Sequence, residues 1–214
     1  MTSFLRPLAY RHRWIYDTVT AVSALSVGGV SRLRGLGVEA LQNQLEAGAA
    51  VLDLCCGSGE AAAPWLAAGF SVTGLDIAPR ALDLAAIRQP QMHLVEGLAE
   101  DPPLAAERFA AVQISVALHE FPREERVQVL TSCLRLLQPD GWLVLVDLHP
   151  AGPWLKLPQQ LFCALFETDT ATAMLEDDLV FQLNELGFCS VKQELLAGQA
   201  LQRITARKPP SAQP

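Results

Sequence analysis

Short apolar runs and amphipathic segments alternate along the middle of this 214-residue chain. The apolar runs predict buried strands near residues 50–55, 71–76, 92–96, 109–115 and 142–148. The amphipathic segments predict helices near 59–68, 79–88 and 123–137, and Pro139-Asp140-Gly141 predicts a turn before the fifth strand. Strands that alternate with helices form parallel βαβ units, so the pattern predicts an α/β fold with a doubly wound sheet.

The two ends of the chain depart from this alternation. Residues 1–45 are amphipathic and predict a helical cap ahead of the sheet, divided into two helices at Gly28–Gly29. Residues 150–185 predict a helical insertion after the fifth strand. The last two apolar runs, FCSVKQELL and ALQRITAR, predict an antiparallel hairpin joined by Gly198 at the edge of the sheet.

The length of the chain limits how these elements can be divided. A chain of 214 residues is long enough for one domain with a substantial core and short for two. We therefore expect a single domain over residues 1–208, with a mostly parallel seven-stranded sheet, and a disordered tail over residues 209–214.

Charge and cysteine usage exclude several classes of function. The formal net charge of −7 argues against a nucleic-acid partner, because phosphate neutralisation needs clustered Lys and Arg. The 5 cysteines form no C-x-x-C pair, which predicts no metal site and no disulfide scaffold but buried thiols in a reducing cytoplasm. Arginines interrupt the N-terminal segment before a signal peptide forms, and no run approaches the roughly 20 apolar residues of a membrane span. These features predict a cytoplasmic protein with a small-molecule partner and leave its oligomeric state open.

The stretch VLDLCCGSGE, residues 51–60, is the most informative segment of the chain. It predicts a buried strand that ends in a turn of small residues, and the next apolar run ends in Asp76. In an open parallel sheet, ligands bind beyond the carboxyl ends of the strands, where backbone amides are accessible and an acid can bind ribose hydroxyls. The sequence therefore predicts a nucleoside site at these two strand ends.

The turn favours a cationic nucleoside over a dinucleotide. A dinucleotide site uses Gly-x-Gly-x-x-Gly and rests its pyrophosphate on a helix N-terminus. Here Gly57 and Gly59 are the only glycines, Ala62 occupies the third position, and Glu60 would repel a diphosphate. Asp53 and Glu60 could instead face the ammonium and sulfonium groups of S-adenosylmethionine.

The chain resembles the class I S-adenosylmethionine-dependent methyltransferases over about residues 48–148. The matching segments are DLCCGSG, with Cys55 in place of the first glycine of D-x-G-x-G-x-G, then Asp76, VEGLAEDPPL, FAAVQISVAL and LRLLQPDGWLVLVD. Within this superfamily the strongest resemblance is to the ubiquinone/menaquinone-biosynthesis C-methyltransferases. The chain departs from that group at residues 118–121, LHEF, where Arg-Asn-Val is usual. The resemblance implies a Rossmann-like fold, S-adenosylmethionine as cofactor with S-adenosylhomocysteine as product, and an acceptor such as a demethylated quinol.

The resemblance also implies which residues contact the cofactor. Asp76 matches the acid on the ribose, Leu98 and Ala99 match the pair at the adenine, and Ser115 matches the small polar residue that ends the fourth strand. The full implied set is Asp53, Cys55, Gly57, Ser58, Gly59, Ala62, Asp76, Ile77, Leu98, Ala99 and Ser115. Cys55 and Cys56 are interpreted as small residues that fit the loop, not as redox groups.

His119 is the candidate general base for the acceptor, because it follows the fourth strand at the carboxyl edge and histidine titrates near neutral pH. The alternative is a structural role, as a helix cap or a partner of a backbone group. His12 and Tyr16 on the cap, Asp147 at the end of the fifth strand and Trp154 on the insertion are candidate substrate-binding residues. The apolar face of the insertion could form a lid over an apolar acceptor, pack on the core or contact a membrane surface.

Three functions therefore remain open. The leading hypothesis is a methyltransferase that acts on carbon or oxygen of a small lipophilic aromatic molecule. A non-catalytic S-adenosylmethionine-binding module and a nicotinamide-dependent oxidoreductase are the alternatives.

Overall fold

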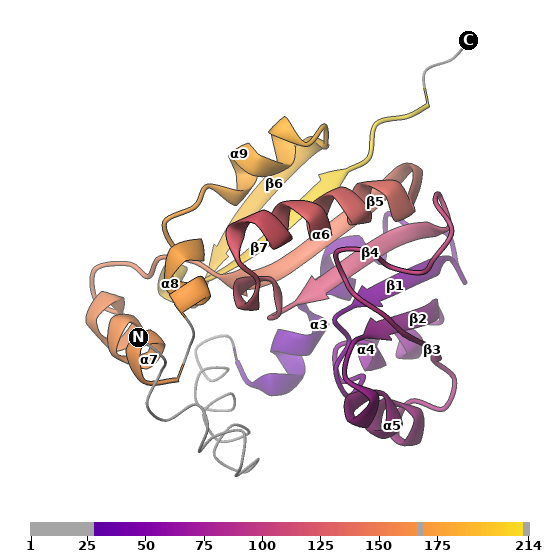
Figure 1. The fold of residues 1–214 in the computed structure, drawn as a ribbon, viewed down its shortest axis with the longest axis horizontal. Helices are drawn as coiled ribbons and strands as arrows, with labels where there is room; N and C mark the ends of the chain where they lie inside the picture. Colours follow the sequence, from indigo (N-terminus) through magenta and orange to yellow (C-terminus); the bar gives the residue numbers. More distant parts are fainter. Residues whose placement is uncertain (1–27, 167–168, 212–214) are drawn as a thin grey trace.

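A computed structural model describes residues 28–166 and 169–211 of the chain. Its centre is one seven-stranded sheet with the order β3-β2-β1-β4-β5-β7-β6 (Figure 1). The strands are β1 (Ala50–Leu54), β2 (Ser71–Asp76), β3 (His93–Glu96), β4 (Phe109–Ser115), β5 (Leu137–Leu148), β6 (Cys189–Leu196) and β7 (Leu201–Arg207). The first five strands are parallel, and β7 pairs antiparallel with both β5 and β6. The expected mostly parallel sheet with a C-terminal antiparallel hairpin is confirmed.

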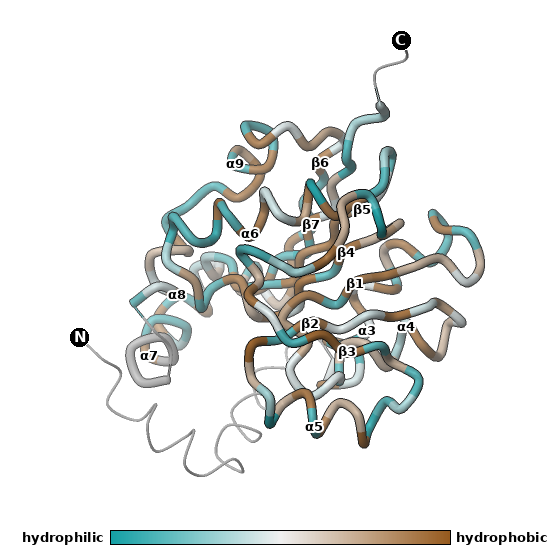
Figure 2. Tube along the Cα trace, turned by 45° about the vertical axis from the view of Figure 1, so that its right-hand side comes forward, coloured by the Kyte–Doolittle hydropathy of each residue, from teal (hydrophilic) through white to brown (hydrophobic). Residues whose placement is uncertain are grey.

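Helices cover both faces of the sheet, as the continuous apolar strands require. Three helices pack on one face: α3 (Val30–Leu41), α4 (Ala63–Ala67) and α5 (Pro79–Arg88). The other face is covered by α6 (Arg123–Leu136) and α9 (Leu179–Glu185). Successive residues of one strand enter different cores, because side chains alternate across a sheet: Val51 lies in the first cluster and Leu52 in the second. Figure 2 shows the apolar strands enclosed between these layers.

The strand order places a topological switch point between β1 and β4. In the order of strands, β2 and β3 lie to one side of β1, and β4 and β5 lie to its other side. The loops after β1 and β4 therefore diverge, and they open a crevice at the carboxyl edge of the sheet where ligands of doubly wound proteins bind.

Two local expectations were wrong. The helix expected near 59–68 begins only at Ala63, because the preceding residues form a loop with left-handed backbone at Gly57 and Gly59. The turn expected at Pro139-Asp140-Gly141 lies inside β5, where Asp140 has a φ of 64° and the register against β4 shifts. Such a shift is a β-bulge, which bends a strand without ending its pairing.

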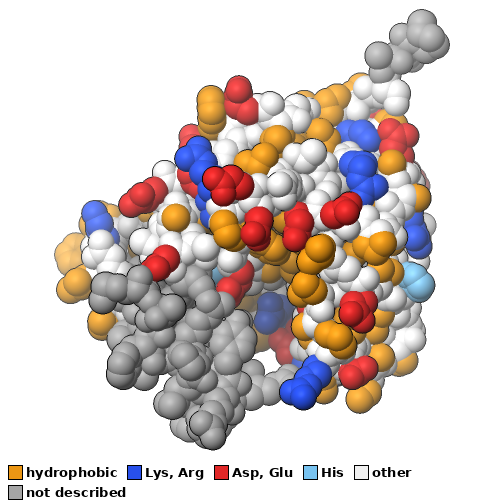
Figure 3. All heavy atoms as spheres, in the orientation of Figure 1, with side chains coloured by type: hydrophobic (Ala, Val, Ile, Leu, Met, Phe, Trp, Pro, Cys, Tyr) orange, Lys and Arg blue, Asp and Glu red, His pale blue; other side chains and the backbone are white. Residues whose placement is uncertain are grey.

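The segment after β5 is helical, as expected, but its helices differ in environment. It contains α7 (Lys156–Phe166), α8 (Asp169–Met174) and α9. Leu179 and Leu183 bury α9 in the core, and Ala171 and Met174 are the buried residues of α8. Trp154, Leu157 and Leu161 at and before α7 are exposed, and hydrophobic side chains are visible over α7 at the left of the molecule (Figure 3).

The elements predicted at the two ends of the chain lie only partly within the described residues. The predicted cap lies mostly in residues 1–27, outside the described residues, and within the described part α3 follows Gly28 and Gly29. None of the helices in the described ranges is long and apolar enough to cross a membrane.

Candidate functional site

The loop after β1 has a backbone that side chains rarely adopt. Cys55, Gly57 and Gly59 have φ values of 62°, 52° and 77°. A glycine is favoured at each such position, and Cys55 occupies the left-handed region at a cost on the order of 1 kcal/mol. A Cβ atom at Gly59 would lie 3.1 Å from Cγ of Gln89, so α5 also packs closely against this turn. The loop is a tight backbone cradle at the switch point.

Asp76 closes the other side of this cradle. Its Oδ2 accepts a hydrogen bond from the amide of Gly57 at 2.8 Å, and its Oδ1 accepts one from the amide of Ala78 at 2.9 Å. These bonds fix the carboxylate at the end of β2 and leave further lone pairs on both oxygens. Ile77 and Leu98 beside it are 62% and 44% exposed. Two exposed apolar side chains next to an oriented acid suit a nucleoside, whose base is flat and whose ribose carries hydroxyls.

Asp53 and Ser115 supply two buried polar atoms at the centre of the switch point. Asp53 is 1% exposed, and its Oδ1 accepts a hydrogen bond from Nε2 of Gln113 at 3.0 Å. In the described part of the chain, Oδ2 of Asp53 and Oγ of Ser115 are buried without a hydrogen-bond partner. Buried polar atoms are nearly always satisfied, so an unpaired carboxylate oxygen here fits a cationic ligand group. The cradle and these atoms together fit S-adenosylmethionine.

Glu60 was expected to face a cation of the ligand, but in the structure it is bonded to two arginines. Its carboxylate accepts hydrogen bonds from Nη2 of Arg34 at 3.2 Å and from Nη1 of Arg88 at 2.7 Å. The same Arg88 nitrogen donates to Oγ of Ser58 at 2.7 Å. Two arginines therefore neutralise Glu60, and the negative charge available to a ligand comes from Asp53 and Asp76.

Several other predicted cofactor residues are buried. Ala62 has no exposed surface and packs with Val51 and Trp65, so we assign it to the core and not to the ligand. Ala99 is buried in the cluster on the opposite face. Burial raises the pKa of the Cys55 thiol well above its ordinary value, and burial also raises that of Cys56. Protonated thiols are poor nucleophiles, which supports the interpretation of both cysteines as packing residues.

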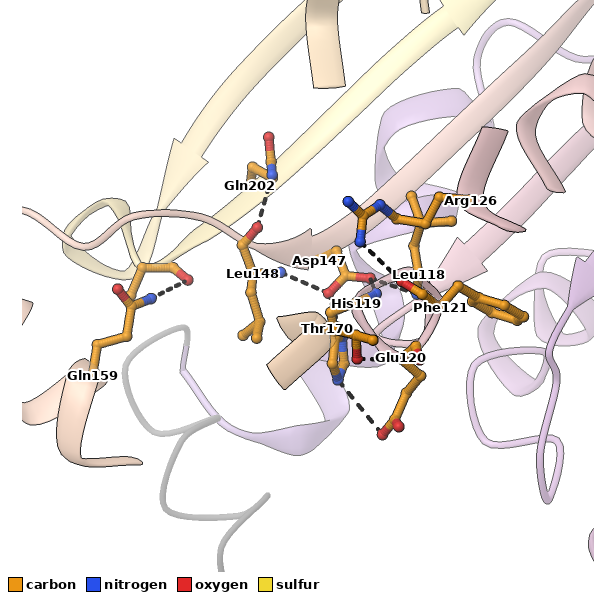
Figure 4. Close-up of polar contacts among 11 residues, drawn as sticks. Leu118, His119, Glu120, Phe121, Arg126, Asp147, Leu148, Gln159, Thr170 and Gln202 are labelled. Carbon is orange, nitrogen blue, oxygen red and sulfur yellow. Dashed lines mark hydrogen bonds and ion pairs between the residues drawn. The ribbon is translucent and has the colours of Figure 1, made fainter. Parts of the chain in front are cut away.

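His119 lies in a short helical turn after β4, η1 (Leu118–Glu120), and is bonded to Asp147 of β5 (Figure 4). The Nδ1 atom of His119 is 2.6 Å from Oδ1 of Asp147, and both side chains are buried. Oδ1 also accepts from the amide of Leu148, and Oδ2 accepts from the amides of Leu118 and His119. An ionised carboxylate is only an acceptor, so Nδ1 of His119 carries the hydrogen in this pair.

This geometry changes the expected role of Asp147. The sequence predicted a substrate-binding residue, but Asp147 is 1% exposed and both of its oxygens already accept hydrogen bonds. It is the residue that orients His119. Glu120 does not take this role, because its Oε1 lies on the Nε2 side of the ring, 3.8 Å from Nε2 of His119 and beyond a hydrogen bond.

The turn that carries His119 is held by helices on both sides. Arg126 of α6 donates to the carbonyl of Phe121 at 2.9 Å and forms an ion pair with Asp177, which follows α8. Thr170 of α8 donates to the carbonyl of Glu120 at 3.2 Å (Figure 4). The position of His119 is therefore coupled to α8.

The remaining candidates for substrate binding are His12, Tyr16 and Trp154. His12 and Tyr16 are outside the described residues. Trp154 is 94% exposed. The helix that follows it is anchored by Gln159, which donates to the carbonyl of His149 at 2.7 Å and accepts from the amide of Ala151 at 2.8 Å. Within the described ranges, no cluster of three or more His, Cys, Asp or Glu could hold a metal ion.

Gln113 is the residue of this site that sequence reasoning missed. It lies in the middle of the apolar strand FAAVQIS and is fully enclosed. A polar residue in a central strand is itself a signal, because burial requires it to find partners.

Comparison with known proteins supports the same assignment. Residues 51–141 match a methyltransferase domain family. An uncharacterized methyltransferase from Synechocystis sp. is 40% identical to this chain over 97% of both chains. A demethylmenaquinone methyltransferase from Paenarthrobacter aurescens is 33% identical over 66% of this chain, and the match spans only 54% of that protein. A 2-phytyl-1,4-naphtoquinone methyltransferase from Thermosynechococcus vestitus is 32% identical over 60% of this chain and 59% of its own length.

A solved structure has the same fold. A SAM-dependent methyltransferase from Archaeoglobus fulgidus superposes with a TM-score of 0.70 over 92% of this chain and 100% of its own, at 16% identity.

Proposed function

The chain belongs to the class I S-adenosylmethionine-dependent methyltransferases, and we propose that its acceptor is a small lipophilic aromatic molecule such as a demethylated quinol. The cofactor is S-adenosylmethionine, which supplies a methyl group already activated by the sulfonium. We assign the binding of this cofactor to the loop after β1, to Asp76, and to the exposed apolar pair Ile77 and Leu98. The quinol class is supported by the named activities of two relatives, each matched over little more than half of its length.

The observation that carries the chemical part of this proposal is the bond between His119 and Asp147. Because Nδ1 of His119 donates to Asp147, the basic lone pair of the imidazole is on Nε2. In the proposed reaction, Nε2 accepts the proton that the acceptor loses as its carbon or oxygen gains the methyl group. The nearby carboxylate stabilises the imidazolium that forms, as in other His–Asp pairs.

His119 is 3% exposed, which bears on how the acceptor reaches it. Thr170 of α8 is bonded to the turn that carries His119, and α7 comes before α8 in the chain. Within the insertion at 150–185, we assign α7 and α8 the role of a lid that moves to admit the acceptor, while α9 stays packed in the core. The exposed apolar residues Trp154, Leu157 and Leu161 suit contact with a lipophilic molecule.

The test is methyl transfer from labelled S-adenosylmethionine to demethylated quinols, with the wild type, His119→Ala and the control His93→Ala. A general base contributes roughly 10²–10⁴ in rate, so His119→Ala should lose about that factor in kcat while its affinity for S-adenosylhomocysteine stays within about twofold. His93 is exposed on β3, so its variant should keep the wild-type rate.

Three outcomes would contradict parts of this proposal. If His119→Ala transfers the methyl group at the wild-type rate, His119 is not the general base, although the protein is still a methyltransferase. If the labelled product belongs to another chemical class, the acceptor is not a quinol. Tight cofactor binding with no labelled product from any lipid-soluble acceptor favours a non-catalytic binding module.

A further inference from the structure

Gln113 connects three elements beneath the cofactor loop. Its Oε1 accepts a hydrogen bond from Nε1 of Trp65 on α4 at 2.7 Å. Its Nε2 donates to Oδ1 of Asp53 on β1 at 3.0 Å and to the carbonyl of Ala61 at 3.3 Å. Every polar atom of this side chain is therefore bonded, although the residue is 1% exposed.

The orientation of the Gln113 amide follows from its partners. An indole nitrogen is only a donor, so the amide oxygen must face Trp65 and the amide nitrogen must face Asp53. Helix α3 closes the site from a third direction, because a Cβ atom at Gly37 would lie 1.9 Å from Oε1 of Gln113. The amide has no room to turn, and Asp53 always meets a donor on Oδ1.

Asp53 is left half-satisfied by this arrangement. In the described residues its Oδ2 is buried and has no hydrogen-bond partner. The charges that act on it come from Arg34 on α3, which is already bonded to Glu60, and from Asp76 on β2. The neighbouring thiols of Cys55 and Cys56 are protonated, as argued above. Burial raises the pKa of Asp53 to about 6, against the opposing effects of Gln113 and Arg34.

We propose that Gln113 is a positioning residue of the cofactor site, which fixes Asp53 so that Oδ2 meets a cationic group of the methyl donor, and that donor binding is thereby coupled to loss of a proton from Asp53. The proton passes from Oδ2 to solvent, and the carboxylate then pairs with the ligand cation. The inference rests on the assignment of Asp53 to the cofactor site. It adds a function for a residue that contacts no substrate.

Calorimetry of donor binding measures this coupling directly. Titrations at pH values from 5 to 7, each in two buffers of different ionisation enthalpy, report the number of protons released per ligand bound. With a pKa near 6, Asp53 is about 9% ionised at pH 5 and about 91% at pH 7, so donor affinity should be about tenfold weaker at pH 5. About half a proton should be released at pH 6 and nearly none well above pH 7.

Three ligands identify the cation that Asp53 faces. S-adenosylmethionine carries a sulfonium and an ammonium, S-adenosylhomocysteine carries only the ammonium, and 5′-methylthioadenosine carries neither. Equal proton release by the first two ligands assigns Asp53 to the ammonium, and release with S-adenosylmethionine alone assigns it to the sulfonium. Equal release with 5′-methylthioadenosine would overturn the inference, since no cation would then be involved.

Variants separate a positioning role from a merely structural one. Gln113→Met keeps the volume of the side chain but removes the donor to Asp53, so the pH range of proton release should move upward and affinity at pH 7 should fall. Because the defect is one of ionisation, affinity should recover as the pH is raised. A defect in packing alone would leave the pH range unchanged, and that result would overturn the inference.

Two further variants keep the test decisive. Gln202→Met is the matched control, because Gln202 is also a buried sheet glutamine, donating to the carbonyl of Leu148 at 2.7 Å. It should leave the pH range of proton release unchanged. Asp53→Asn should bind the donor weakly and without proton release, and it decides the question if Gln113→Met does not fold. A wild type that binds donor with no proton release between pH 5 and 7 overturns the coupling, whereas a wild type that binds no donor overturns the cofactor site itself.

Discussion

Two buried aspartates at the same edge of the sheet have opposite surroundings. Asp53 on β1 and Asp147 on β5 are each 1% exposed, and β4 lies between their strands. Asp147 accepts hydrogen bonds from three backbone amides and from His119, so both of its oxygens are satisfied. Asp53 accepts one bond from Gln113, and its other oxygen has no partner in the described residues.

The difference indicates that Asp147 has a structural role, whereas Asp53 has an oxygen left to bind a ligand. A buried carboxylate is costly unless hydrogen bonds replace its lost hydration. At Asp147 the protein supplies them all, and the charge serves to orient His119. At Asp53 the protein supplies only part of them, so a cationic ligand can supply the rest and bind more tightly for that reason.

The largest expected effect comes from Asp147→Asn. An amide offers two donors on one side, so whichever way it turns it faces two groups that are themselves donors. We expect a loss of about 3–5 kcal/mol of unfolding free energy, measured by urea denaturation. Asp140→Asn is the control, because Asp140 is half-exposed in a surface pair with Arg207 and should change stability by less than about 1 kcal/mol. Equal effects of the two substitutions would show that Asp147 is not specially satisfied.

The next effect comes from Gly37→Ala, which disturbs the amide that keeps Asp53 half-satisfied. The new Cβ atom would lie 1.9 Å from Oε1 of Gln113, in a site enclosed by α3 and α4. We expect destabilisation of about 2–3 kcal/mol by thermal unfolding, together with weaker donor binding. Gly35→Ala in the same helix meets Oε1 of Glu39 at an ordinary 3.6 Å and should be neutral or stabilising by about 0.5–1 kcal/mol. A tolerated Gly37→Ala would mean that Gln113 has room to move.

The smallest effect has the opposite sign. Asp53→Asn should stabilise the ligand-free protein by about 1–2 kcal/mol at pH 7, because it removes a buried charge whose pKa folding raises to about 6. The folded state holds this proton more tightly than the unfolded state, so the unfavourable contribution of Asp53 is absent below about pH 4 and is complete above about pH 6. The advantage of the variant in urea denaturation should therefore disappear as the pH falls from 7 to 4. A destabilised variant at pH 7 would show that Oδ2 is satisfied in the folded protein.

Much of the fold could be predicted because each buried strand is a short, mainly apolar run in the sequence. The runs ending at Asp76 and Ser115 carry apolar residues on both faces, because both faces of a parallel sheet are covered, and their bounds agree with β2 and β4. The start of α4 could not be predicted in the same way. It depends on the left-handed backbone of Gly57 and Gly59, which a sequence permits but does not impose. The bulge at Asp140 was missed for a similar reason, since turn-forming residues also suit a bulge.

The features of the site also fall into those that the sequence predicts and those that it does not. Local sequence determined the glycine turn, the acid at the end of β2 and the candidate histidine, because each is a residue type at a fixed distance from a strand end. Only the tertiary structure paired His119 with Asp147, occupied Glu60 with two arginines and placed Gln113 beneath Asp53. These contacts join residues 26 to 60 positions apart, and their geometry depends on how strands and helices pack against one another. A strand end tells which residues face the crevice, whereas the charge that remains there for a ligand depends on which partners the fold has already supplied.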